Sequence, residues 1–315
     1  MSLPKFNLVT RTSGVNRALK EGLFKPKTCE LEFIDVDPII AAFRRQVRGG
    51  EFDICEMAIT TYLCAKAHGK PMTAIPVPLV RQFHHGATLV NTTSGVRVPK
   101  DLEGKRVGVN RGYTVTTGVW ARGIMADEYG LDLSKVTWVL SGDEHVAEYR
   151  APSNVVPIEA GKKMEDMLAS GELAAAIGAD VKHPDVRPLI PDALEAGLEA
   201  FKREGVFPIN HLVVIRDDLL EKHPDLAADI FNAFSASKKH YVEQLKAGKI
   251  EKPDAADAVA LKVMAISGAD PMPYGIEPNR KTLETLIRHA FRQSIIPKMV
   301  TPEDIFAKGT HGLAG

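Results

Sequence analysis

The chain has 315 residues, which is enough for one large domain or two medium ones. Its 40 basic residues balance its 40 acidic residues. This balance excludes the strongly basic surface of a protein that binds nucleic acid or docks on an anionic membrane. The sequence has no apolar run of about 18 residues, so we expect no membrane-spanning segment.

The start of the chain and the cysteines bear on the cellular compartment. The first residues lead directly into an apolar, strand-like segment, so no secretory signal is expected. Cys29, Cys55 and Cys64 are odd in number and lack the spacing of a metal site or a redox pair. We therefore expect buried, reduced thiols in a cytoplasmic protein.

Short apolar runs alternate with helical patterns along the chain. Strands are predicted at residues 6–10, 30–36, 52–57, 73–80, 107–109, 136–140, 173–177 and 207–215. Helices are predicted at residues 15–21, 38–48, 60–68, 116–129, 164–170, 224–245 and 281–293. This alternation is typical of an α/β protein with two doubly wound sheets whose strands run parallel.

The strand at residues 207–215 decides the predicted domain organisation. The strand–helix pattern pauses near residue 92 and resumes with a second set that ends near residue 206. A crossing back at residue 207 would give two lobes joined by two connections. We therefore expect lobe 1 to comprise residues 1–92 and 207–315 and lobe 2 to comprise residues 93–206, with a ligand cleft between them.

Residues 101–123 contain a predicted strand followed by a polar helix start. The strand ends at Val109, and Tyr113, Thr116 and Thr117 follow it. Free backbone N–H groups at such a helix start suit a carboxylate or another anion. Simple helix capping is the alternative role of the two threonines.

Several motifs resemble known families. Asp-Leu-Glu-Gly-Lys-Arg-Val-Gly-Val at residues 101–109 resembles the segment that opens the second lobe of many type II periplasmic-binding-protein folds. Segments 51–57, 75–86, 206–211 and 271–280 resemble motifs of the 4,5-dihydroxyphthalate decarboxylase family, and Tyr113-x-x-Thr-x-x-x-Trp-x-Arg-Gly123 also fits. These matches occur in the family's order and cover most of residues 50–310.

The chain departs from that family's pattern around the expected pocket. The departures lie at Cys55, Val80, His84, Gly86 and Asn210, where the family has alanine, serine, arginine, serine and methionine. They indicate a relative that acts on a different hydroxylated aromatic acid.

The resemblance implies a two-lobed fold and a cofactor-independent decarboxylase, which would convert a substrate such as 4,5-dihydroxyphthalate to protocatechuate and CO2. It implies no metal and no partner other than the small aromatic carboxylate. Neither nucleic acid nor membrane is expected as a partner, and self-association is left open. Such a reaction requires a held carboxylate, a polarised phenol and a general acid that protonates the ring carbon.

The resemblance also selects candidate site residues. His85 and His211 are the candidate acid/base pair, because imidazole titrates near neutral pH, and Glu56 is a base or an orienting group. Arg81 is the candidate carboxylate clamp, because its planar fork suits bidentate binding. The remaining binding candidates are Tyr113, Thr116, Thr117, Arg11 and Tyr274.

Structural roles remain open for several polar residues. Strand-end histidines often donate to backbone carbonyls, and Arg81 would equally suit an ion pair. Arg122 is expected to be structural, and Trp120 is expected in the core. The cluster of residues 143–145, which ends in His145, has no metal-ligand spacing and is expected to form a solvated loop.

Two other functions compete with decarboxylation. A solute-binding protein of a transport or sensing system would use the same fold and close around a small carboxylate without chemistry. A hydrolase or a thiamine-precursor enzyme would need a nucleophile or cofactor contact, and the sequence provides no motif for either.

Overall fold

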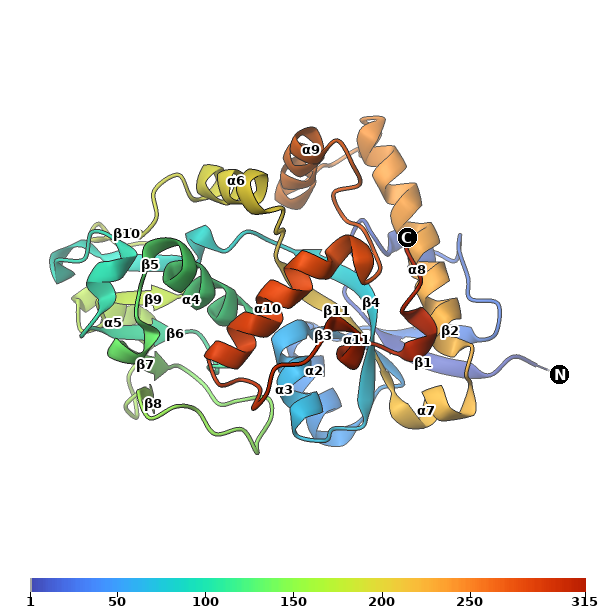
Figure 1. Ribbon diagram of the computed structural model, residues 1–315, viewed down its shortest axis with the longest axis horizontal. Helices are drawn as coiled ribbons and strands as arrows, with labels where there is room; N and C mark the ends of the chain where they lie inside the picture. The colour runs from blue at the N-terminus through green and yellow to red at the C-terminus, as the bar shows by residue number, and fades with distance from the viewer. Residues whose placement is uncertain (1) are drawn as a thin grey trace.

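The structure is a computed structural model that describes residues 2–315. It contains two β-sheets that lie side by side along the long axis, with helices packed around them (Figure 1). The first sheet has the strand order β2-β1-β3-β11-β4. Its strands are β1 (Lys5–Val9), β2 (Glu30–Ile34), β3 (Ile54–Ala58), β4 (Met72–Arg81) and β11 (Ile209–Arg216).

The second sheet has the strand order β10-β5-β9-β6-β7-β8. These strands are β5 (Thr88–Asn91), β6 (Arg106–Val109), β7 (Thr137–Leu140), β8 (Val155–Pro157), β9 (Ala175–Ile177) and β10 (Val186–Pro188). The helices that follow the strands of this sheet are α4 (Thr116–Tyr129), α5 (Met164–Ser170) and α6 (Ala193–Glu204).

Alternating side chains of the inner strands form the core on both faces of the first sheet. On β3, Cys55 and Met57 pack with Phe43 of α2 (Ile40–Gly49) and with α3 (Ile59–Ala67), whereas Ile54 packs on the opposite face with Phe234 of α8 (Leu226–Lys246). Successive side chains of a strand point to opposite faces, so a strand buried on both faces is apolar throughout. Glu56 is the exception on β3.

Five other helices belong to the part of the fold around the first sheet. They are α1 (Arg17–Lys20), α7 (Asp217–Lys222), α9 (Ala255–Ser267), α10 (Arg280–Arg292) and α11 (Pro302–Ile305). In Figure 1, α10 lies in front of the region between the two sheets, and α6 and α9 lie along the upper edge. Within residues 2–315, no helix is both long enough and apolar enough to cross a membrane.

Both sheets are mixed rather than parallel. Strands β1, β2 and β3 are parallel, but β11 is antiparallel to both β3 and β4. The path of the chain explains this direction. The chain leaves the first sheet at the end of β4 and returns beside that same end to begin β11, so the two strands run in opposite directions. In the second sheet, β5 is likewise antiparallel to β9 and β10.

The chain changes sheets between β4 and β5, because β5 pairs with β9 and β10. Residues 88–91 therefore belong to the second sheet, although the predicted lobe 1 extends to residue 92. The return lies between β10 and β11. The division into lobes at residues 92 and 207 otherwise stays a prediction.

Tyr62 joins three segments of the first sheet's core, which gives a test of the fold. Its hydroxyl donates to the carbonyl of Ile305 and accepts from the N–H of Ala74 at 3.1 Å. In Tyr62→Phe both buried backbone groups lose a partner, so we expect the free energy of unfolding to fall by about 1–3 kcal/mol in urea titrations.

Tyr129→Phe is the matched control for this substitution. The Tyr129 side chain is partly exposed, and its hydroxyl makes no hydrogen bond among residues 2–315. We expect its unfolding midpoint to equal that of the wild type. Equal midpoints for both variants would contradict the role assigned to Tyr62.

Candidate functional site

The structure brings Glu56 and His211 together on neighbouring strands. His211 pairs with Ala58 across β3 and β11, which places it one diagonal step from Glu56. The Nδ1 atom of His211 lies 2.7 Å from Oε1 of Glu56. A carboxylate at this distance fixes Nδ1 as the donor and leaves Nε2 to exchange a proton. Among residues 2–315, no group is hydrogen-bonded to Nε2 of His211.

The loop after β1 supplies the other partners of Glu56. Its Oε2 accepts from the hydroxyl of Thr10 at 2.9 Å and from the N–H of Arg11 at 3.0 Å, and the Nε of Arg11 lies 3.5 Å from Oε1. Burial acts to raise the pKa of Glu56, but the hydrogen bond and charge of His211 and the charge of Arg11 outweigh it and lower the pKa. Glu56 is therefore an ionised carboxylate that accepts from Nδ1 of His211.

His85 lies in a different environment. Its Nε2 is 3.1 Å from Oε1 of Glu128 on α4, and its Nδ1 is buried without a partner among the described residues. The neighbouring His84 points elsewhere, with its Nε2 2.9 Å from Oδ1 of Asn210. Burial lowers the pKa of His84 to about 4, so its ring is neutral at pH 7. His85 and His211 thus have separate carboxylate partners, and a joint catalytic role stays a prediction.

Arg81 is part of a hydrogen-bonded unit with the Pro-rich segment before α10. Its Nη1 donates to the carbonyl of Phe207 at 2.9 Å, and its Nη2 donates to the carbonyl of Pro273 and to Oδ1 of Asn279. Burial lowers the pKa of Arg81 to about 10. Tyr274 is fully buried beside this unit, and its hydroxyl has no partner among residues 2–315. These contacts favour the structural role of Arg81 over that of a free clamp.

A cavity of about 470 Å³ is nevertheless lined by both Arg11 and Arg81. The end of β4, the start of α6 and the start of α9 form its other walls, and most of its lining is apolar. The side chain of Arg11 is 45% exposed, and its terminal guanidinium nitrogens make no hydrogen bond within the described part of the chain. Arg11 is thus the better-placed of the two arginines to hold an anion.

The predicted anion site at the start of α4 is filled by groups of the protein itself. The N–H of Tyr113 and both the N–H and the hydroxyl of Thr114 donate to the carboxylate of Glu144. The hydroxyls of Thr116 and Thr60 lie 2.8 Å apart, and the N–H of Thr60 donates to Oγ1 of Thr116 at 3.3 Å. Thr116 therefore joins the starts of α3 and α4.

Three further α4 residues have clear positions. The Arg122 guanidinium lies 3.8 Å from the centre of the Tyr113 ring and donates to Oε1 of Gln293. Trp120 is buried, and its Nε1 donates to the carbonyl of Ile209 at 2.9 Å. Arg122 and Trp120 are therefore structural, as expected. Thr117 is partly exposed, and its binding role stays a prediction.

The expectation of a solvated loop at residues 143–145 is wrong for His145. Its side chain is 4% exposed, and its ring lies 6.3 Å from the ring of Phe43. The Phe43 ring also contacts His211 edge-on at 5.0 Å. The acidic neighbours made this loop look exposed, but its position after the carboxyl end of β7 is where α/β folds place ligand-binding residues.

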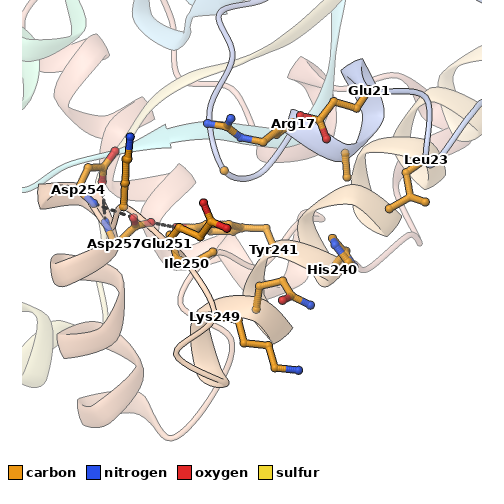
Figure 2. A pocket seen from close by; sticks show the side chains of 14 residues that line it. Arg17, Glu21, Leu23, His240, Tyr241, Lys249, Ile250, Glu251, Asp254 and Asp257 are labelled. Atoms are coloured by element: carbon orange, nitrogen blue, oxygen red, sulfur yellow. Dashed lines mark hydrogen bonds between the residues drawn. The ribbon is translucent and has the colours of Figure 1, made fainter.

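A different cavity is shown in Figure 2. Its volume is about 470 Å³, and it lies between α1, the end of α8 and the start of α9. Charged side chains of both signs surround it, and the hydroxyl of Tyr241 donates to Asp257 on its wall. None of the residues predicted for the site lines this cavity. Within residues 2–315, no group of three or more His, Cys, Asp or Glu side chains is arranged to hold a metal ion.

Solved structures of other proteins define the fold class of this chain. The alkanesulfonate-binding protein SsuA of Xanthomonas axonopodis, bound to MOPS, aligns with 98% of both chains at a TM-score of 0.52 and 14% identity. A Candida albicans protein with the generic periplasmic-binding-protein fold aligns with 99% of both chains at a TM-score of 0.53 and 14% identity. The predicted two-lobed, type II periplasmic-binding-protein-like fold is therefore confirmed.

The sequence comparisons then define the family. The NMT1/THI5-like family model matches residues 12–244, and the chain belongs to this family. It is 29% identical to a 4,5-dihydroxyphthalate decarboxylase of Comamonas testosteroni in an alignment of 300 residues that covers 88% of this chain and 90% of that protein. It is 33% identical to one of Pseudomonas putida in an alignment of 193 residues that covers 55% of this chain and 74% of that protein. The resemblance found in the motifs is confirmed.

The ionised state of Glu56 predicts a dependence of stability on pH. Because folding lowers its pKa, its contribution is fully present above the ordinary value of 4.5 and is lost as the pH falls through the lowered value. We expect Glu56→Gln to reduce the free energy of unfolding by about 1.5–3 kcal/mol at pH 7, and the difference from wild type to shrink below pH 4.5.

Urea titrations between pH 3 and pH 7 measure this difference. Glu32→Gln is the control, because Glu32 is an exposed residue of β2 whose only ionic partner within residues 2–315 is Lys5 at the surface. The control should show no comparable loss at pH 7. A deficit in Glu56→Gln that is equally large at every pH would contradict the assignment of an ionised Glu56.

Proposed function

We propose that this protein is a cofactor-independent decarboxylase of a hydroxylated aromatic carboxylate. The observation that carries the proposal is the hydrogen-bonded pair of Glu56 and His211, because the Glu56 carboxylate also contacts Arg11 and Arg11 lines a mostly apolar cavity. The names of the two relatives agree with this chemistry. We further propose a cytoplasmic location, which the three free, buried cysteines support.

In this proposal His211 transfers the proton. Its Nε2, protonated while Nδ1 donates to Glu56, delivers the proton to the ring carbon that bears the carboxylate. The bond from that carbon to CO2 then breaks, and its electron pair restores the aromatic ring. The product carries a proton where CO2 has left, so the charges and atoms balance. A negative Glu56 stabilises the imidazolium before the transfer.

Arg11 holds the substrate in the same proposal. Its guanidinium is partly exposed, lines the cavity and lies next to the carboxylate that orients His211. A carboxylate bound there would place the aromatic ring over the apolar lining, and the Glu56 carboxylate links Arg11 to His211. Ring hydroxyl groups supply the electrons that make the ring carbon basic enough to accept a proton.

The first experiment measures CO2 release and the ultraviolet spectrum with a panel of hydroxyphthalates and hydroxybenzoates. We expect at least one acid to be converted by the wild type. His211→Ala should lower kcat about 100- to 10,000-fold, because it removes a positioned proton donor. An unchanged kcat in His211→Ala would exclude this residue as the acid.

The control for this variant is His240→Ala. His240 lies on α8 and lines the cavity in Figure 2, which neither Glu56 nor His211 lines. Its substitution should leave kcat and KM unchanged. If no acid of the panel is converted by the wild type, the proposed decarboxylase activity is contradicted.

A solute-binding function is the second candidate, and the fold favours it independently of the Glu56–His211 pair. In this case the protein would bind a small carboxylate and release it unchanged. Calorimetry that shows tight binding of an acid, together with its quantitative recovery after a long incubation, would support this candidate over decarboxylation.

A further inference from the structure

His145 is a buried imidazole whose hydrogen-bonding capacity is unused. Its Nδ1 is shielded from solvent and has no partner, and its Nε2 makes no hydrogen bond with any residue from 2 to 315. Burial, with the charges of Arg44 and Arg111, lowers the pKa of His145 to about 4. The ring is therefore neutral at pH 7 and offers one donor and one acceptor. Buried polar groups in native proteins almost always have partners, so this ring requires an explanation.

Arg111 is held rigidly in the loop next to His145. Its backbone has a φ of 67°, the left-handed region that most side chains avoid. Its N–H donates to the hydroxyl of Ser141 at 2.8 Å, and its carbonyl accepts from the N–H of Gly142. Strained backbone of this kind persists where the surrounding structure requires it and is frequent at binding sites.

Within the described residues the guanidinium of Arg111 has no acidic partner, although Asp143 and Glu144 directly precede His145 in the sequence. Among residues 2–315 it forms no salt bridge and no side-chain hydrogen bond, and burial lowers its pKa. Asp143 is bound by Arg44 at 2.6 Å and by Arg48 at 3.1 Å. Glu144 is occupied by the backbone before α4. The site around His145 therefore has an excess of positive charge.

We propose that Arg111 and His145 form a second anion-binding pair, which holds a carboxylate of the substrate from the side of the second sheet. Phe43 contacts both His145 and His211, so this pair and the Glu56–His211 pair share one aromatic neighbour. Arg11 binds the first carboxylate and Arg111 the second, which makes the ligand an aromatic dicarboxylate. The ligand class rests on the proposed function, whereas the anion-binding role rests on the geometry.

The test measures binding without turnover. Phthalate is the probe, because it has two carboxylates but no hydroxyl group to activate the ring, and benzoate is its monocarboxylate counterpart. In calorimetry we expect the wild type to bind phthalate more tightly than benzoate. Arg111→Asn, which suits the left-handed backbone, should weaken phthalate binding about 10- to 100-fold and leave benzoate binding within about threefold.

Arg97→Asn is the matched control, because Arg97 is an exposed residue before β6 and lies outside the site. Its phthalate affinity should equal that of the wild type, and thermal melting checks that each variant is folded. A second readout is the NMR signal of the His145 ring, assigned by its loss in His145→Gln. Addition of phthalate should shift this signal in the wild type and in Arg97→Asn.

Three outcomes would overturn the inference. They are a wild type that binds neither probe, an unchanged phthalate affinity in a folded Arg111→Asn, and a His145 signal that phthalate does not move. Failure of the proposed function is distinguishable from these. If no hydroxylated acid releases CO2 while phthalate binding still depends on Arg111, the anion-binding pair stands and the decarboxylase proposal fails.

Discussion

A carboxylate buried in the middle of a sheet constrains this whole structure. Glu56 is 1% exposed on an inner strand, where an ionised group without partners would be strongly destabilising. Its partners come from the loop after β1 and from β11, segments that are far apart in sequence. β11 reaches this position only because the chain leaves for the second sheet and returns. The ionisation of Glu56 therefore depends on the double crossing of the chain.

The sequence predicted the elements that have strong patterns. Those confirmed include β1, β3, α4, α8 and α10, each with a clear apolar run or an amphipathic face. The strands β8 and β10 were missed, because three residues are too few to show a periodic pattern of apolar side chains. The helices α6 and α9 were missed as well. Strand direction was also wrong for β11. An apolar run of residues is equally compatible with either direction, and only the return path determines which is formed.

The candidate site shows what a motif can and cannot predict. The motifs that contain Arg81 and Asn279 were identified separately, and the structure joins them through a hydrogen bond. Sequence resemblance thus found residues that belong together but not the reason for their association. Glu56 and His211 do meet, whereas His145 was missed because its acidic neighbours suggested an exposed loop. Arg44 and Arg48 neutralise one of those neighbours, and backbone N–H groups bind the other.

The position of Glu144 has a consequence for how ligand preference can change on this scaffold. Its carboxylate occupies the backbone donors of Tyr113 and Thr114, so the chain carries an internal competitor for any anion that approaches the start of α4. A replacement of this single side chain by a neutral or shorter one would free those donors. A new ligand specificity would then arise by the loss of an inhibitor that is built into the protein, which is a shorter evolutionary path than the construction of a new binding site.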